Sequence, residues 1–194
     1  MKNILLTLLF ILFGVFAQAQ KGTTTYSISY GEGNGQLRGV IAMAKRFDST
    51  SEGPVKFFDF NYNIGKRKHA ALETGISLLK HDFTYKLWDS GSMSSTVSER
   101  SIYSLIVPLK LRTDILKYFF ISGGFLAHIN IEDGGQRTLG IGSSLGIGLG
   151  AGIQYFHKEK YGVFIYPQVN VHSLGFGLIE QHTSFGISYR IHKN

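Results

Sequence analysis

The segment Thr183-Ser-Phe-Gly-Ile-Ser-Tyr-Arg-Ile191 alternates without interruption between large side chains and small or polar ones. Successive side chains of a β-strand point to opposite faces, so a period of two indicates a strand and not a helix. Phe185 and Ile187 would then share one face of this strand, and Ser184 and Gly186 the other. The segment decides the fold class because the same period returns along the chain.

Similar alternation predicts seven further strands, within residues 26–30, 58–64, 72–78, 103–111, 119–131, 145–155 and 163–171. Short polar connections at 65–69, 113–116 and 157–160 alternate with mostly longer, Gly- and Ser-rich ones at 31–54, 86–99, 132–138 and 173–181. An even number of strands, with short turns at one end and longer loops at the other, is typical of an outer-membrane barrel. We therefore predict an all-β fold, an eight-stranded antiparallel up-and-down transmembrane β-barrel.

Composition limits the alternatives. The 194 residues include 24 glycines and no cysteine, and only 17% are charged, with a formal net charge of +7. The absence of cysteine excludes a disulfide framework, a Cys-ligated metal and a catalytic thiol. The apolar content excludes a disordered chain. Nucleic acid is not expected as a partner, because no stripe of alternating basic and aromatic residues accompanies the charge.

The first 19 residues have the layout of a secretory signal peptide. Lys2 gives a basic start, residues 4–16 carry no charge, and Ala17-Gln18-Ala19 supplies the small residues that signal peptidase requires. The apolar run is too short to span a hydrocarbon core of ~30 Å. We expect cleavage after Ala19, export, and a barrel domain formed by residues 20–194.

The kind of polar residue indicates which face is outward. A water-facing surface is ~25–35% charged, whereas the polar faces here are mostly Gly, Ser, Asn, Gln and His. Such residues suit a lumen, and this favours apolar faces toward lipid. An aromatic girdle is expected near the short turns, formed by Tyr26, Tyr62, Tyr118, Phe119, Tyr155, Phe156, Tyr161 and Tyr189. A soluble periplasmic lipocalin-like carrier, with the faces reversed, stays open as an alternative.

The sequence resembles the small eight-stranded outer-membrane barrel proteins of Gram-negative bacteria, the OmpX-like and OmpA-membrane-domain-like class. Four segments carry the resemblance: the export signal, residues 102–111, residues 118–124 and residues 184–191. One departure is that Ile191 is followed by His192-Lys193-Asn194, where such barrels commonly end on an aromatic residue. The resemblance implies an outer-membrane location, insertion by the barrel-insertion machinery, and a porin-like architecture.

Five charged residues fall on the predicted inner faces: Asp59, Glu73, Lys110, Arg112 and Arg190. Opposite charges in a low-dielectric interior must pair, because an unpaired buried ion costs several kcal/mol. Eight strands leave an interior just wide enough for side chains to fill. We therefore predict an ion-pair network that closes the lumen.

Glu180, His182 and Ser184 are spaced two apart, which places an acid, a base and a hydroxyl on one strand face. Nucleophilic catalysis needs these three groups within hydrogen-bond reach, but alternate residues of a strand lie nearly ~7 Å apart. A polar lumen row is the favoured interpretation, and a lipid A deacylase-like hydrolase is the alternative. His128 and His172 fall singly on lumen faces, and neither a metal site nor a cofactor is expected.

Three local features qualify the strand assignment. The even-numbered glycines from Gly140 to Gly152 predict a bare inner face against which Phe120, Phe164 or Tyr166 packs. Pro108 and Pro167 cannot donate to a ladder, so we expect a bulge or a missing bond at each. The apolar face changes parity after Leu78, which predicts a bulge near residues 80–82.

The first long loop contains helical spacing over residues 36–47. Its apolar residues recur at i, i+3, i+4 and i+7, with basic residues beside them. Such a helix would lie at the outer leaflet, with cations against lipopolysaccharide phosphates. The residues expected to contact the membrane are Leu37, Arg38, Val40, Ile41, Lys45 and Arg46.

Together these features predict a structural or binding protein of the outer membrane, not an enzyme. The expected partners are membrane lipid, lipopolysaccharide and an external ligand whose identity the sequence does not disclose. A monomer is expected.

Overall fold

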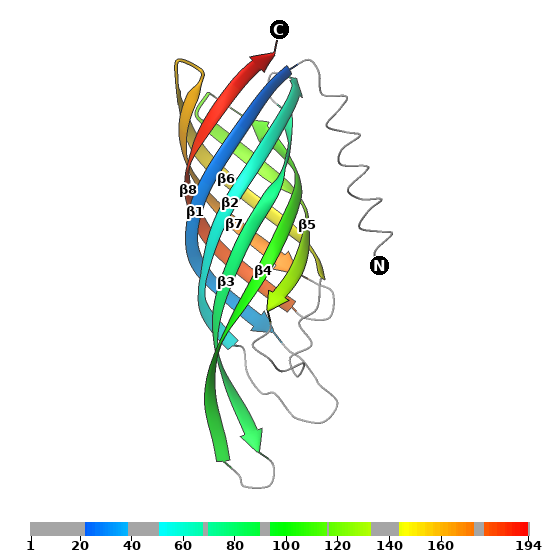
Figure 1. Cartoon of the computed structure of the whole chain (residues 1–194), viewed down its shortest axis with the longest axis vertical. Helices are drawn as coiled ribbons and strands as arrows, with labels where there is room; N and C mark the ends of the chain where they lie inside the picture. Colours follow the sequence, from blue (N-terminus) through cyan, green and yellow to red (C-terminus); the bar gives the residue numbers. More distant parts are fainter. Residues whose placement is uncertain are drawn as a thin grey trace.

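The computed structural model describes residues 22–38, 51–67, 70–89, 94–115, 117–132, 144–172 and 177–193. Eight antiparallel strands form a closed barrel in sequence order (Figure 1), which confirms the predicted fold class. No helix among these residues is long and apolar enough to cross a membrane. The strands are β1 Gly22–Arg38, β2 Ser51–Arg67, β3 Ala70–Asp89, β4 Ser94–Asp114, β5 Phe119–Glu132, β6 Ser144–His157, β7 Tyr161–His172 and β8 Gly177–Lys193.

Pairing of β1 with β8 closes the barrel, from Gly22 opposite Lys193 to Arg38 opposite Gly177. The start of β1 and the end of β8 lie at one end of the barrel, together with the short turns (Figure 1). The β6–β7 turn is type I′, because Lys158 and Glu159 have positive φ and Lys160 N–H donates to the His157 carbonyl at 3.1 Å. We call this end the short-turn end and the opposite one the long-loop end.

The two faces of the wall differ in polarity, in the direction predicted. In β7 every side chain from Tyr161 to His172 alternates between exposed and buried. Large apolar residues such as Leu149 and Ile187 are more than half exposed on the outside. Buried serines, amides and charged groups occupy the inside, which is the reverse of a lipocalin-like carrier.

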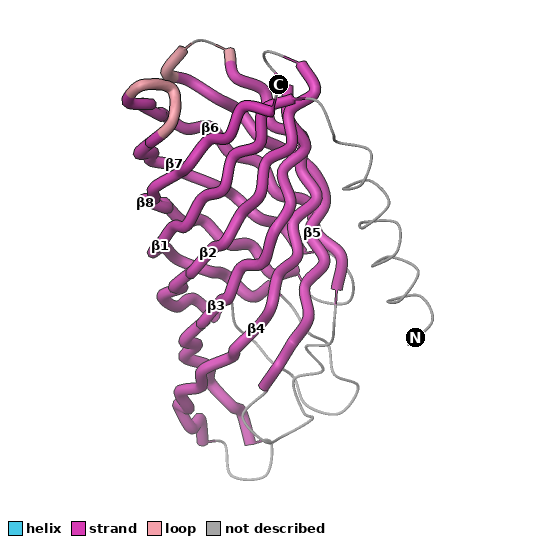
Figure 2. Tube along the Cα trace, turned by 45° about the horizontal axis from the view of Figure 1, so that its top comes forward, coloured by secondary structure: helices cyan, strands magenta, loops and turns pink. Residues whose placement is uncertain are grey.

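The strands extend further toward the long-loop end than the alternation predicted. Residues 31–38 continue β1, and the residues assigned to the 86–99 loop include the ends of a β3–β4 hairpin that projects beyond the neighbouring strands (Figure 2). Backbone pairing forms these strand segments even though their side chains do not alternate in polarity. A prediction based on alternation therefore could not detect them. The prediction that both segments are loops was wrong.

The predicted helix over 36–47 is wrong at its start. Gln36, Leu37 and Arg38 belong to β1, where Gln36 pairs with Glu52 of β2 and Ile179 of β8. The other residues expected to touch the membrane, Val40, Ile41, Lys45 and Arg46, lie outside the described residues, as does the predicted signal peptide.

The bulge predicted near residues 80–82 is absent. The β3–β4 register runs without a shift from Ser77 opposite Ile106 to Asp89 opposite Ser94. Phe83 therefore continues the inner face, where it clusters with Ile102 and Leu178. The change of parity reflects this small apolar cluster inside the lumen, not a change in the strand.

The ladders are interrupted beside both strand prolines, as expected. The β3–β4 register omits the pairs of Pro108 and of its neighbour Val107, and the β6–β7 register omits those of Pro167 and of its neighbour Tyr166. Each proline keeps its pair on the other side, with Leu126 and Thr183 respectively. A residue without an N–H thus weakens one ladder at each site while the strand continues in register.

Candidate functional site in the lumen

Glycines on β6 create the space that the lumen residues occupy. A Cβ added to Gly150 would lie 2.5 Å from the Tyr166 ring, and one added to Gly152 would lie 2.5 Å from the Phe120 ring. These contacts confirm the bare glycine face for Tyr166 and Phe120, which pack at a ring-centroid distance of 5.1 Å. Phe164 differs, because its ring covers Gly186 of β8 instead.

A charged cluster, formed by Asp59, Glu73, Lys110, Arg112 and Gln168, crosses the interior. Lys110 is buried and donates through Nζ to Oε1 of Gln168 at 2.7 Å. Arg112 Nη1 lies 3.9 Å from Glu73 Oε2. A glutamine thus belongs to the cluster beside the charged residues, although charge alone predicted only the ionic members.

Among the described residues, Asp59 is held by hydroxyls and by no directly bonded cation. Ser29 donates to its Oδ2 at 3.0 Å, and Ser184 donates to the same atom at 3.4 Å. The Lys110 ammonium still interacts with this carboxylate through space. Because the carboxylate is buried, these donors replace the water that it loses on folding.

Two arginines rest on aromatic rings near the short-turn end. The Arg112 guanidinium carbon lies 3.6 Å from the Phe120 centroid, and that of Arg190 lies 3.7 Å from the Phe156 centroid. Phe156 was assigned to the outer girdle, and that assignment was wrong: a Cβ added to inward-facing Gly162 would lie 2.7 Å from its ring. Its even position in β6 already indicated the inner face. Arg190 also donates to Thr25 Oγ1 at 3.4 Å.

A histidine cluster lies toward the long-loop end, around fully buried Glu180. His172 Nε2 lies 3.1 Å from Glu180 Oε2, and the His172 ring packs against His128 at a centroid distance of 4.9 Å. His81 and His182 are also within electrostatic range of this carboxylate. The histidine cluster thus comprises Glu180 and the four histidines His81, His128, His172 and His182. The expectation of histidines lying singly in the lumen was therefore wrong.

The register explains how histidines from separate strands meet. His128 of β5 pairs with Ser144 of β6, and His172 of β7 pairs with Gly146 of β6. A Cβ added to Gly146 would lie 2.8 Å from His172 Nδ1. The small residues of β6 therefore let the rings approach each other across that strand. Side-chain size on an intervening strand was the signal in the sequence that could have revealed this cluster.

The three candidate catalytic groups do not assemble into a triad. Glu180 binds His172 instead of His182, and Ser184 donates to Asp59. His182 stacks on Phe57 with ring centroids 3.7 Å apart. All three are buried in the lumen and engaged with other partners, so the arrangement offers no activated nucleophile to a substrate.

Side chains leave little space beside the charged cluster. A cavity beside the charged cluster, bordered by Asp59, Lys110 and His182, measures only about 10 Å³. That volume approaches the minimum for one water, ~10–15 Å³. Val55, Phe57, Leu79, Ile106 and Leu126 form an apolar cluster in the same lumen. Within the described ranges, no three His, Cys, Asp or Glu side chains are grouped to hold a metal ion.

Comparison with known proteins places the fold among outer-membrane barrels. No family model matches the chain, and no curated protein matches it. Among solved structures, outer membrane protein OprG from Pseudomonas aeruginosa is 10% identical, with a TM-score of 0.57 over 89% of this chain and 97% of that chain. Ail of Yersinia pestis is 14% identical, with a TM-score of 0.44 over 88% and 99%. The chain thus has the fold of small eight-stranded outer-membrane barrels.

Proposed function

We propose that the protein is a closed, non-conducting barrel of the bacterial outer membrane that presents its long-loop end to the cell exterior. The observation that carries this proposal is the opposite polarity of the outer and inner faces of the barrel wall. The outer face exposes large apolar side chains on all eight strands. An apolar surface of this size is unfavourable in water and is typical of a surface in contact with lipid. The lumen holds buried ions, amides and hydroxyls, and several of them bond to one another, as Lys110 does to Gln168.

The filled interior supports a role in binding or structure instead of transport through the lumen. An eight-stranded barrel has no aqueous channel unless its side chains leave one, and Lys110, Arg112 and their partners occupy this one. Function would then reside in what the long-loop end presents, including the projecting β3–β4 hairpin. Contact of residues 37–46 with lipopolysaccharide belongs to this proposal as an untested prediction.

The first experiment combines membrane fractionation with gel mobility of the unboiled and boiled protein. We expect the protein in the outer-membrane fraction and faster migration before boiling. Recovery by osmotic shock in soluble form, without a heat-dependent shift, would overturn the proposal. Reconstitution in a planar bilayer tests the closed lumen. No steady conductance is expected, and stable open channels would contradict that part.

The hydrolase alternative is disfavoured by the separation of Glu180, His182 and Ser184 among different partners. Lipid A extracted from cells that express the protein should keep all its acyl chains. Loss of an acyl chain that disappears in Ser184→Ala would revive the alternative.

A further inference from the structure

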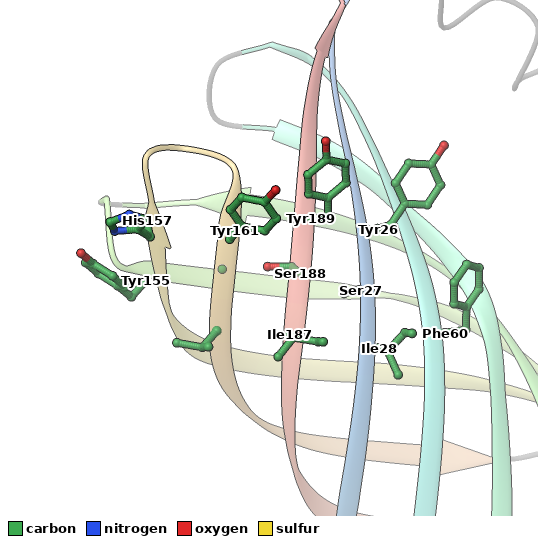
Figure 3. A pocket seen from close by; sticks show the side chains of 12 residues that line it. Tyr26, Ser27, Ile28, Phe60, Tyr155, His157, Tyr161, Ile187, Ser188 and Tyr189 are labelled. Atoms are coloured by element: carbon green, nitrogen blue, oxygen red, sulfur yellow. The ribbon is translucent and has the colours of Figure 1, made fainter.

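The outer wall is hollowed near the short-turn end. The hollow measures about 600 Å³ and is bordered by residues of β1, β2, β6, β7 and β8 (Figure 3). Its volume falls within the ~300–1,000 Å³ range of small-molecule sites. Its lining is almost entirely apolar, and includes Tyr26, Ile28, Phe60, Tyr155, Tyr161 and Ile187.

The order of residues along the strands produces the hollow. Tyr161 and Tyr189 pair across β7 and β8, with ring centroids 5.4 Å apart, and form part of its rim. The next pair, Gly162 with Ser188, faces the lumen, so only backbone covers the outer wall there. The exposed Ile187 then begins the aliphatic row beneath (Figure 3). The recess in this lipid-facing surface thus lies between the tyrosines of the rim and the aliphatic residues below them.

We propose that this hollow binds one phospholipid, with an acyl chain in the recess and an anionic headgroup at the β6–β7 turn. The inference rests on the proposed membrane location, which would place the short-turn end at the periplasmic leaflet. Tyrosines at the rim suit that level, because their rings contact hydrocarbon while their hydroxyls reach the headgroup region.

Charge selects the headgroup. Exposed Lys158 and Lys160 flank Glu159 in the turn that borders the hollow, and His157 lines it. In the turn next to the hollow two lysines therefore outnumber one glutamate, which is complementary to a phosphate that lacks a compensating choline.

The test reconstitutes the mature full-length chain with phosphatidylglycerol or phosphatidylcholine and counts retained lipids by native mass spectrometry as detergent is stripped. We expect one retained phosphatidylglycerol. Ile187→Trp fills the recess and should lower retention about tenfold, equivalent to about 1.4 kcal/mol. Leu149→Trp is the matched control, since Leu149 is 61% exposed against 64% for Ile187 and does not border the hollow. It should retain the lipid.

The double variant Lys158→Gln/Lys160→Gln tests the headgroup separately. It should reduce the preference for phosphatidylglycerol over phosphatidylcholine without abolishing binding of the lipid's acyl chain. Equal retention by Ile187→Trp and the wild type would overturn the site, as would a dimer mass in place of a lipid adduct. Heat-dependent gel mobility is read on every sample. A barrel that inserts but retains no lipid refutes this site alone, whereas a barrel that does not insert refutes the proposed function as well.

Discussion

The charged cluster and the histidine cluster share one lumen but treat their buried polar groups differently. In the charged cluster, Lys110 bonds to Gln168 and Arg112 lies beside Glu73. In the histidine cluster, Glu180 Oε1 and His128 Nε2 have no hydrogen-bond partner among the described residues. The first cluster is held by hydrogen bonds to amide and hydroxyl groups together with one ion pair, and the second by ring packing and the His172 contact with a single carboxylate. A narrow barrel can therefore be closed by either means, with different sensitivity to substitution.

Lys110→Met is expected to give the largest effect. Asp59 and Glu73 both interact with this ammonium, so its removal leaves buried carboxylates less compensated. Breaking a buried ionic arrangement costs about 3–5 kcal/mol. The measurement is the urea midpoint of the heat-dependent gel shift. Lys117→Met, at an exposed turn, is the control and should leave that midpoint unchanged. A stable Lys110→Met barrel would mean that the charged cluster does not depend on its ions.

Gly146→Ala should disturb the histidine cluster. Its Cβ would lie 2.7 Å from the Val171 carbonyl oxygen and 2.8 Å from His172 Nδ1, so the ring that contacts Glu180 must shift. Overpacking of this kind costs about 1–3 kcal/mol. Gly123→Ala is the matched control, because its Cβ would meet only the flexible end of Leu149 at 2.7 Å and an oxygen at 3.7 Å. Equal unfolding midpoints for the two variants would argue against crowding at His172.

Ser184→Ala removes one of the hydroxyl donors of Asp59 while Ser29 remains. A lost hydrogen bond of this kind costs about 0.5–1.5 kcal/mol, so the unfolding midpoint should fall slightly. Ser188→Ala offers a comparison on the same face of the same strand. A loss as large as that of Lys110→Met would show that Ser184 does more than solvate this carboxylate.

The smallest effect is expected at the long-loop end, outside the lumen. Partial burial alone would raise the pKa of Asp82, but the Ser101 hydroxyl and the Lys80 ammonium outweigh it, and the pKa is lowered. A carboxyl with a lowered pKa stabilises the fold above its unfolded pKa, and that contribution disappears as pH falls through the folded pKa. Such exposed pairs contribute about 0–1 kcal/mol.

Hydrogen exchange of the β3–β4 hairpin should therefore accelerate modestly between pH 7 and pH 3, after correction for intrinsic rates. Asp82→Asn should reduce that dependence. The same acceleration in wild type and Asp82→Asn would assign the pH effect to other groups.

Sequence periodicity was enough to predict the barrel because each residue's polarity reports its own face. Phe185 and Ser184 illustrate this, since adjacent positions differ in exposure in the way the alternation requires. Contacts across the lumen are not local, because they depend on which strands are neighbours and on the size of the residue between them. The approach of His128 to His172 therefore required the register and Gly146 in addition to the pattern. Phe83 is an exception, because it faces a small apolar cluster inside the lumen and its polarity therefore resembles that of an outward-facing residue.

Closure by β1 and β8 has a consequence for the order of folding. Every other strand pair joins sequence neighbours, whereas Gly22 meets Lys193 across the full length of the described residues. The entropy of loop closure grows with the length of the loop, and distant contacts form slowly. We expect an intermediate that is an open sheet with β1 and β8 as unpaired edges. Unpaired edges of this kind pair readily with other chains, so we expect a chaperone to matter most at the last step of folding.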